Sequence, residues 1–135
     1  MKFLFAVVVM FFLLQGCFTV KSNNNFTYQK IEPQNYAAKL AEQPRPYYLI
    51  DVRTPGEYAK GHIEGAVNYN FFAFHYGRDI TPLDKNIPAF IYCHTCHRSP
   101  FAARIMKHKG FKQVYDLKGG FSQWNKQGLP SVKNF

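Results

Sequence analysis

The sequence predicts an α/β protein whose parallel sheet is covered by helices on both faces. Short apolar runs of strand length alternate with segments of helical periodicity, which is typical of strand–helix–strand units. Two runs, residues 47–52 and 88–92, are almost continuously apolar, as strands buried on both faces are. A chain of 135 residues with 47% hydrophobic content is expected to form one folded domain.

The elements of the first half follow from local signals. Residues 26–31 alternate as a short strand, and Pro33 opens a predicted helix. The apolar face of that helix is expected to contain Tyr36, Ala37, Leu40 and Ala41. After the strand at 47–52, residues 54–57 (Thr-Pro-Gly-Glu) have the residues of a capping box with proline at the first helical position. They predict a short helix, and a strand is expected at 66–69.

The elements of the second half centre on one helix. Ser99 at the N-cap and Pro100 at the first helical position predict a helix over residues 99–109. Its apolar stripe is expected to be Phe101, Ala102, Ile105 and Met106. An irregular helix with a loop is expected over 71–86. A strand at 113–117 precedes the turn Gly119-Gly120, and a final helix contains Trp124.

The N-terminus has the form of a bacterial export signal. Lys2 precedes an apolar run of twelve residues, 3–14, which is shorter than the roughly 20 that span a bilayer. The run ends in Leu-Gln-Gly-Cys17, which resembles a lipobox and implies that Cys17 carries lipid; cleavage of an ordinary secreted protein nearby is the alternative. We expect a lipoprotein-type signal peptide at 1–16, a lipid-anchored tether at 17–27 and a folded domain at 28–135. The protein would then be exported and membrane-anchored, facing the periplasm or the cell surface.

The net charge and the spacing of the cysteines indicate which ligands and partners the protein is expected to bind. The net charge is +9, and removing residues 1–16 deletes only Lys2, which leaves +8. A basic balance favours small anions, acidic partners or an anionic membrane surface. The basic residues are scattered, with no basic block or zinc-finger spacing, so nucleic acid is not an expected partner. Cys93 and Cys96 lack a second ligand pair at metal-site spacing, so no metal is expected.

Three segments are expected to meet at the carboxyl ends of the strands, where ligands bind in parallel sheets. They are residues 51–53, the loop 93–99 and Gly119-Gly120. Cys93 would lie at a helix N-terminus, where free backbone N–H groups and the helix dipole favour the nucleophilic thiolate. The N–H groups of the loop are expected to point at its sulfur.

Two long stretches resemble rhodanese-type sulfurtransferases. The first is residues 51–67, DVRTPGEYAKGHIEGAV. The second consists of Tyr92-Cys93, Arg98-Ser99, Ala102-Ala103, Gly110-Phe111, Val114-Tyr115, Leu117, Gly119-Gly120, Trp124 and Gly128-Leu129-Pro130. The resemblance covers about residues 28–132 and implies a single rhodanese-like domain, a three-layer fold with a five-stranded parallel sheet.

The resemblance also implies the chemistry. Cys93 would take up sulfane sulfur as a persulfide from a small anionic donor such as thiosulfate and pass it to a thiol or cyanide-like acceptor, without a cofactor. Arg98 would supply a fixed positive charge, or would pin the loop by pairing with Glu57 or Asp51. Arg53 would guide the donor or form an ion pair. Other substrate contacts would come from His94, Thr95, Cys96, His97 and Ser99. Four residues separate Cys93 from Arg98, one fewer than in related phosphatase loops, and this shorter cradle favours sulfur over phosphorus.

Three alternatives remain at this stage. Cys96 stands where many rhodanese loops carry glycine, so it could resolve a Cys93 persulfide as in a thiol-disulfide or persulfide reductase, or be inert. Residues 93–97 also form the Cys-x-x-Cys-His pattern of c-type haem attachment in electron-transfer proteins, with Met106 or His108 as the distal ligand. A non-catalytic binding module with the same fold is the third.

Overall fold

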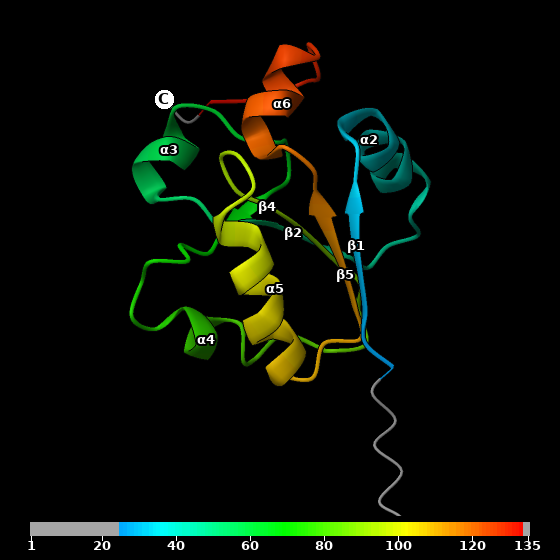
Figure 1. Cartoon of the computed structure of the whole chain (residues 1–135), viewed down its shortest axis with the longest axis vertical. Helices are drawn as coiled ribbons and strands as arrows, with labels where there is room; N and C mark the ends of the chain where they lie inside the picture. The colour runs from blue at the N-terminus through cyan, green and yellow to red at the C-terminus, as the bar shows by residue number, and fades with distance from the viewer. Residues whose placement is uncertain (1–24, 134–135) are drawn as a thin grey trace, which may run out of the picture.

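All five strands of the sheet are parallel in the computed structural model, which describes residues 25–133 (Figure 1). The strands are β1 (Thr27–Ile31), β2 (Tyr48–Asp51), β3 (Val67–Asn68), β4 (Ala89–Tyr92) and β5 (Gln113–Leu117). Their order across the sheet is β1-β5-β4-β2-β3, so the first strand pairs with the last. The predicted fold class is therefore confirmed, including the five-stranded parallel sheet.

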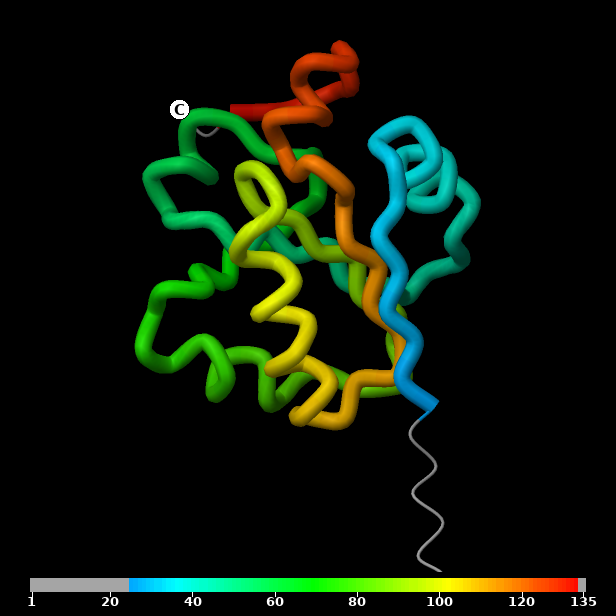
Figure 2. Tube along the Cα trace, viewed as in Figure 1, coloured from blue at the N-terminus to red at the C-terminus, as the bar shows by residue number. Residues whose placement is uncertain are grey.

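Helices cover both faces of the sheet, and the trace in Figure 2 shows the three layers. They are α2 (Pro33–Glu42), α3 (Pro55–Ala59), α4 (Tyr76–Asp79), α5 (Arg98–His108) and α6 (Gly120–Lys126). One apolar cluster joins α4 and α5 to sheet residues such as Ile91 and Val114. The other joins α2 and α6 to Phe90 and Leu117, with Tyr36 and Trp124 packed edge to face. Alternate side chains of β4 and β5 thus pack against the helix layers on opposite faces of the sheet.

The N-cap of α5 lies two residues earlier than predicted. It is His97, not Ser99, and no side-chain cap is present there. Ser99 is instead fully buried, because its hydroxyl contacts the thiol of Cys93. Pro100 becomes the third helical residue, still within the first turn, where its missing N–H costs no helical hydrogen bond.

The buried faces of two helices also differ from the prediction at single positions. The buried residues of α5 are Ser99, Ala102, Ala103 and Met106, at the spacing of one helix face. Phe101 is 59% exposed, since its position lies to one side of that face. In α2, Tyr36 is fully buried whereas Ala41 is exposed for the same reason.

The predicted signal peptide, Cys17 and the tether up to residue 24 lie outside the described residues. Strand β1 begins at Thr27, the last residue assigned to the tether. Within residues 25–133, no helix has both the length and the apolar character needed to cross a bilayer.

Candidate active site

Cys93 follows β4 directly, and its thiol is buried beneath the loop that leads into α5. All four residues of β4 are buried, so the chain leaves the sheet at its carboxyl end with Cys93 still inside the protein. Its Sγ lies 3.4 Å from Oγ of Ser99, on the first turn of α5. The nucleophile expected from the sequence is thus at a strand end and a helix start, with a hydroxyl beside the sulfur.

Helix α6 holds the loop through two backbone hydrogen bonds. The N–H of Phe121 donates to the carbonyl of Cys93 and the N–H of Ser122 donates to the carbonyl of His94, both at 2.8 Å. The start of α6 and the loop lie side by side in Figure 2. In a planar trans peptide the N–H points opposite to the carbonyl. The N–H groups of His94 and Thr95 therefore point away from α6. Among the described residues, the hydrogen-bond contact of the Cys93 sulfur is with the Ser99 hydroxyl and not, as the sequence had led us to expect, with an N–H of the loop.

Gly120 makes this close approach possible. Its φ is +60°, and a Cβ there would lie 2.5 Å from the carbonyl oxygen of Cys93 and 2.7 Å from that of Thr95. These oxygens belong to the backbone and cannot rotate away. Glycine is thus required at position 120, because φ is positive and because a Cβ would clash with the carbonyl oxygens of Cys93 and Thr95.

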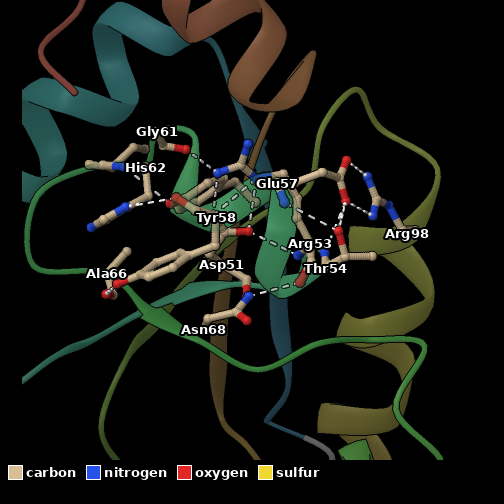
Figure 3. Close-up of polar contacts among 12 residues, drawn as sticks. Asp51, Arg53, Thr54, Glu57, Tyr58, Gly61, His62, Ala66, Asn68 and Arg98 are labelled. Carbon is tan, nitrogen blue, oxygen red and sulfur yellow. Dashed lines mark hydrogen bonds and ion pairs between the residues drawn. The ribbon is translucent and has the colours of Figure 1, made fainter. Parts of the chain in front are cut away.

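Arg98 is held against α3 by a bidentate ion pair with Glu57 (Figure 3). Its two terminal nitrogens donate to the two carboxylate oxygens of Glu57, each at 2.7 Å. Glu57 also closes the predicted capping box, in which the side chain of Thr54 accepts from the N–H of Glu57. The hydrogen bond from Arg98 is the main cause that lowers the pKa of Glu57 to about 2. The pairing of Arg98 with Glu57 that the sequence allowed is present, and it fixes the end of the loop.

Arg53 forms the ion pair that the sequence also allowed. It is 2% exposed, and its side chain donates to both oxygens of Asp51 and to the carbonyl of Gly61 (Figure 3). The guanidinium also lies 4.1 Å from the ring centroid of Phe121 on α6. Arg53 therefore joins β2, the segment after α3 and α6, and its charge is already paired with Asp51.

The middle of the loop is exposed, in contrast to Cys93. His94, Thr95, Cys96 and His97 are all exposed. A hollow of about 420 Å³ is lined by Arg53, Glu57, Lys60, Gly61, His94, Phe121 and Asn125. A different hollow of about 460 Å³ is lined by Cys96 together with Lys30, Glu32, Lys118, Gly119, Gln123 and Gln127. Cys93 and Cys96, the free cysteines of the described residues, are therefore separated, Cys93 in the core and Cys96 at the surface.

This separation does not fit the c-type haem alternative. Haem attachment needs both thiols on one open face, whereas Cys93 is fully buried in an apolar cluster and Cys96 is exposed. Within the part of the chain that the structure describes, no group of three or more His, Cys, Asp or Glu side chains is arranged to hold a metal ion.

Two polar residues behind Cys93 were missed by the sequence analysis. Asp116 in β5 is 1% exposed, and its Oδ2 accepts a hydrogen bond of 2.6 Å from the hydroxyl of Tyr28 in β1. Burial raises the pKa of Asp116, while Tyr28, Ser99 and Lys30 act in the opposite sense. A lone carboxylate in an otherwise buried strand was the signal that could have found this pair.

The chain is similar to known proteins in both sequence and fold. A family model described as "Rhodanese-like domain" matches residues 32–127. The chain is 39% identical over 80 residues to the uncharacterized protein YqhL of Bacillus subtilis, covering 59% of this chain and 62% of that protein, which is less than two thirds of its length. It is 34% identical over 101 residues to the thiosulfate sulfurtransferase GlpE of Pseudomonas paraeruginosa, covering 73% of this chain and 84% of that protein. The crystal structure of the Alr3790 protein from Anabaena has a TM-score of 0.70 at 23% identity, covering 78% of this chain and 93% of that one.

Proposed function

The chain belongs to the rhodanese-like domain family, and on that premise we propose that it is a sulfurtransferase whose Cys93 carries the transferred sulfur as a persulfide. The observation that carries the proposal is the position of Cys93. It lies at the end of a buried strand and the start of α5, under a loop whose carbonyls α6 draws outward. The N–H groups of His94 and Thr95, which this arrangement turns away from α6, would be the donors to a persulfide anion.

The proposed reaction has two displacements. The Cys93 thiolate attacks the outer sulfur of thiosulfate, a bond forms between the two sulfurs, and the sulfur–sulfur bond of thiosulfate breaks to release sulfite. A thiophilic acceptor such as cyanide then attacks the outer sulfur of the persulfide, which forms thiocyanate and restores the Cys93 thiolate. Neither step needs an external oxidant or reductant. The bidentate Arg98–Glu57 pair holds the end of the loop during both steps.

The test is the same substitution made at each cysteine of the loop. In Cys93→Ser, thiocyanate formation from thiosulfate and cyanide should be abolished and intact-mass spectrometry should show no added sulfur after thiosulfate. In Cys96→Ser, the exposed control, both signals should remain. Melting temperatures check that each variant is folded. Retention of more than about a tenth of the activity in folded Cys93→Ser would refute Cys93 as the sulfur carrier.

We further propose that a lipid on Cys17 holds this exported domain on a bacterial membrane, facing the periplasm or the cell surface. The support is the sequence of the N-terminus, a short apolar run that ends in Leu-Gln-Gly-Cys17. Cys17→Ala should abolish metabolic labelling with palmitate and move the protein out of the washed membrane fraction, or leave it uncleaved. Unchanged labelling and unchanged membrane association would contradict the proposal.

A further inference from the structure

Four of the five large apolar side chains that the described residues expose gather around α5. They are Tyr28, Phe72, Phe74 and Phe101, whereas the fifth, Val67, belongs to β3. Phe74 is fully exposed, and Phe72 and Phe101 are 66% and 59% exposed. A single apolar side chain at the surface is ordinary, but several large ones in one place mark a surface that contacts another body.

These side chains are continuous with the outer side of α5. The guanidinium of Arg98 lies 5.5 Å from the ring centroid of Phe72, and Phe101 follows Arg98 on the next turn of the helix. Ile105 lies one turn beyond Phe101. A Cβ on Gly77 of α4 would be 3.6 Å from a methyl carbon of Ile105, so α4 borders the same surface.

Open hollows lie on both sides of α5, and each combines aromatic with basic side chains. The hollow toward α4 has a volume of about 300 Å³, and its lining includes Phe74, Arg78 and Lys109. The hollow toward β1 has a volume of about 280 Å³, and its lining includes Phe26, Tyr28, Arg104 and Lys107. Figure 1 shows α5 with α4 on one side and β1 on the other. Together with Phe72 and Phe101, these residues form one surface, which we call the α5 face.

The charge of the α5 face is positive. Helix α5 contains no acidic residue. The acidic side chains nearby already have partners, since Asp79 contacts His75 at 2.5 Å and Glu57 is paired with Arg98. Four basic side chains form no ion pair within residues 25–133, and they are Arg78, Arg104, Lys107 and Lys109.

The described part of the chain begins at this same face. Nζ of Lys107 lies 5.7 Å from the ring centroid of Phe26, and the trace in Figure 2 starts near the C-terminal end of α5. Phe26 is nine residues after Cys17, and an extended chain of that length spans at most roughly 30 Å. A lipid on Cys17 would therefore keep a bilayer close to the α5 face.

We propose that the α5 face rests on the surface of an anionic bilayer, as a second contact beside the lipid on Cys17. Phe72, Phe74 and Phe101 enter the boundary between headgroups and acyl chains, while the basic side chains contact anionic headgroups. Aromatic side chains flanked by unpaired basic ones are typical of elements that lie in this boundary. The tether argument rests on the proposed lipid anchor, and no part of the inference rests on sulfur transfer.

The test uses the full-length protein, purified from membranes and reconstituted in vesicles of brominated phosphatidylcholine with or without phosphatidylglycerol. The chain has one tryptophan, Trp124, which is buried in the opposite helix layer, so wild type gives the background. In Phe101→Trp, about half of the added fluorescence should be quenched in the anionic vesicles. Most of this quenching should be lost in neutral vesicles and at about 0.5 M salt, which screens the charges.

Ala41→Trp is the matched control, because Ala41 is an exposed position on α2, in the opposite layer. Its fluorescence should not be quenched in either kind of vesicle. Phe74→Trp is the second probe if Phe101→Trp does not fold, since a fully exposed side chain contributes nothing to the core. Melting temperatures check that each variant is folded.

A charge variant tests the electrostatic part separately. Lys107→Gln, added to Phe101→Trp, should lower the ratio of docked to undocked domain about fivefold, as measured by quenching. Lys126→Gln removes an exposed charge from α6 and should leave the ratio unchanged. Equal effects of the two substitutions would overturn the proposal, because only the total charge would then matter.

The remaining outcomes are also decisive. Equal quenching of Phe101→Trp and Ala41→Trp, or quenching that does not depend on phosphatidylglycerol, would overturn the proposal. A blue shift of Phe101→Trp emission that grows with protein concentration without vesicles would show that a second copy covers the α5 face, which also overturns it. Intact mass reports the lipid on Cys17. Protein that lacks the lipid but is still quenched by anionic vesicles would refute the anchor and support the α5 face.

Discussion

Gly120→Ala tests whether the contact between α6 and the loop sets the activity of Cys93. A methyl group at this position would lie 2.5 Å from a carbonyl oxygen that cannot come nearer than about 3.0 Å to a real Cβ. The loop or the start of α6 must therefore move, which weakens the two 2.8 Å hydrogen bonds that join them. We expect about 1 kcal/mol from the positive φ and about 1 kcal/mol for each weakened hydrogen bond, or roughly 3 kcal/mol in total.

Gly128→Ala is the matched control for this change. Gly128 has a φ of +68°, but nothing lies within 4 Å of its added Cβ, so this variant suffers the backbone strain alone. The difference of about 2 kcal/mol should appear as a melting temperature roughly 8 °C lower in Gly120→Ala than in Gly128→Ala. A displacement of the loop by a fraction of an ångström to 1 Å should also reduce kcat/KM for thiosulfate by about 100-fold, with little change in the control. Equal melting temperatures and equal activities in the two variants would refute the reasoning.

Three further outcomes are expected. The folded-state pKa of Glu57, about 2, lies below its ordinary value of 4.5, so its ion pair with Arg98 stabilises the fold above pH 4.5 and this stability is lost as the pH falls to about 2. Glu57→Gln should therefore reduce the change with pH of the free energy of unfolding in urea between pH 4.5 and about 2. An unchanged dependence on pH in that window would contradict the assignment. Asp51→Asn leaves the guanidinium of Arg53 buried without its counter-charge and should lower the free energy of unfolding in urea by about 3 kcal/mol, whereas a loss under about 1 kcal/mol would show that the pair is not structural. Because Cys96 is exposed while Cys93 is buried, Cys96→Ala should hold the proposed persulfide for as long as wild type after one equivalent of sulfane sulfur without reductant. Release of sulfide with loss of both thiols in wild type alone would instead show that Cys96 resolves the persulfide.

The architecture was predictable because it depends on patterns within short windows. Apolar runs of strand length, the capping box at Thr54 and the two-glycine turn are local signals, and each appears in the structure where the sequence indicates it. The approach of the three segments to one edge followed from the parallel sheet alone. The start of α5 was displaced because Ser99 has two uses for its hydroxyl, and the contact with Cys93 outweighs the N-cap.

The environment of Cys93 was not predictable to the same depth. Tyr28 and Asp116 are 88 residues apart in the chain, and only the pairing of β1 with β5 brings them together. The choice between a guiding and a structural role for Arg53 likewise depended on where its side chain turns, which no spacing reveals. It turns inward to Asp51, two residues before it. Long-range pairing and side-chain direction were thus the missing information.

The place of β5 between β1 and β4 also constrains how this chain can fold as it is made. Until residues 113–117 have emerged, β1 has no neighbour in the sheet and the β5 side of β4 remains open. Local elements can form early, but the sheet cannot close until the chain is nearly complete, and such non-local pairing slows folding. A chain stopped before residue 113 would present two unpaired strand edges, which are sites for aggregation. Loss of residues 113–135 should therefore leave the sheet open, since β1 and β4 would both lack β5 as their neighbour.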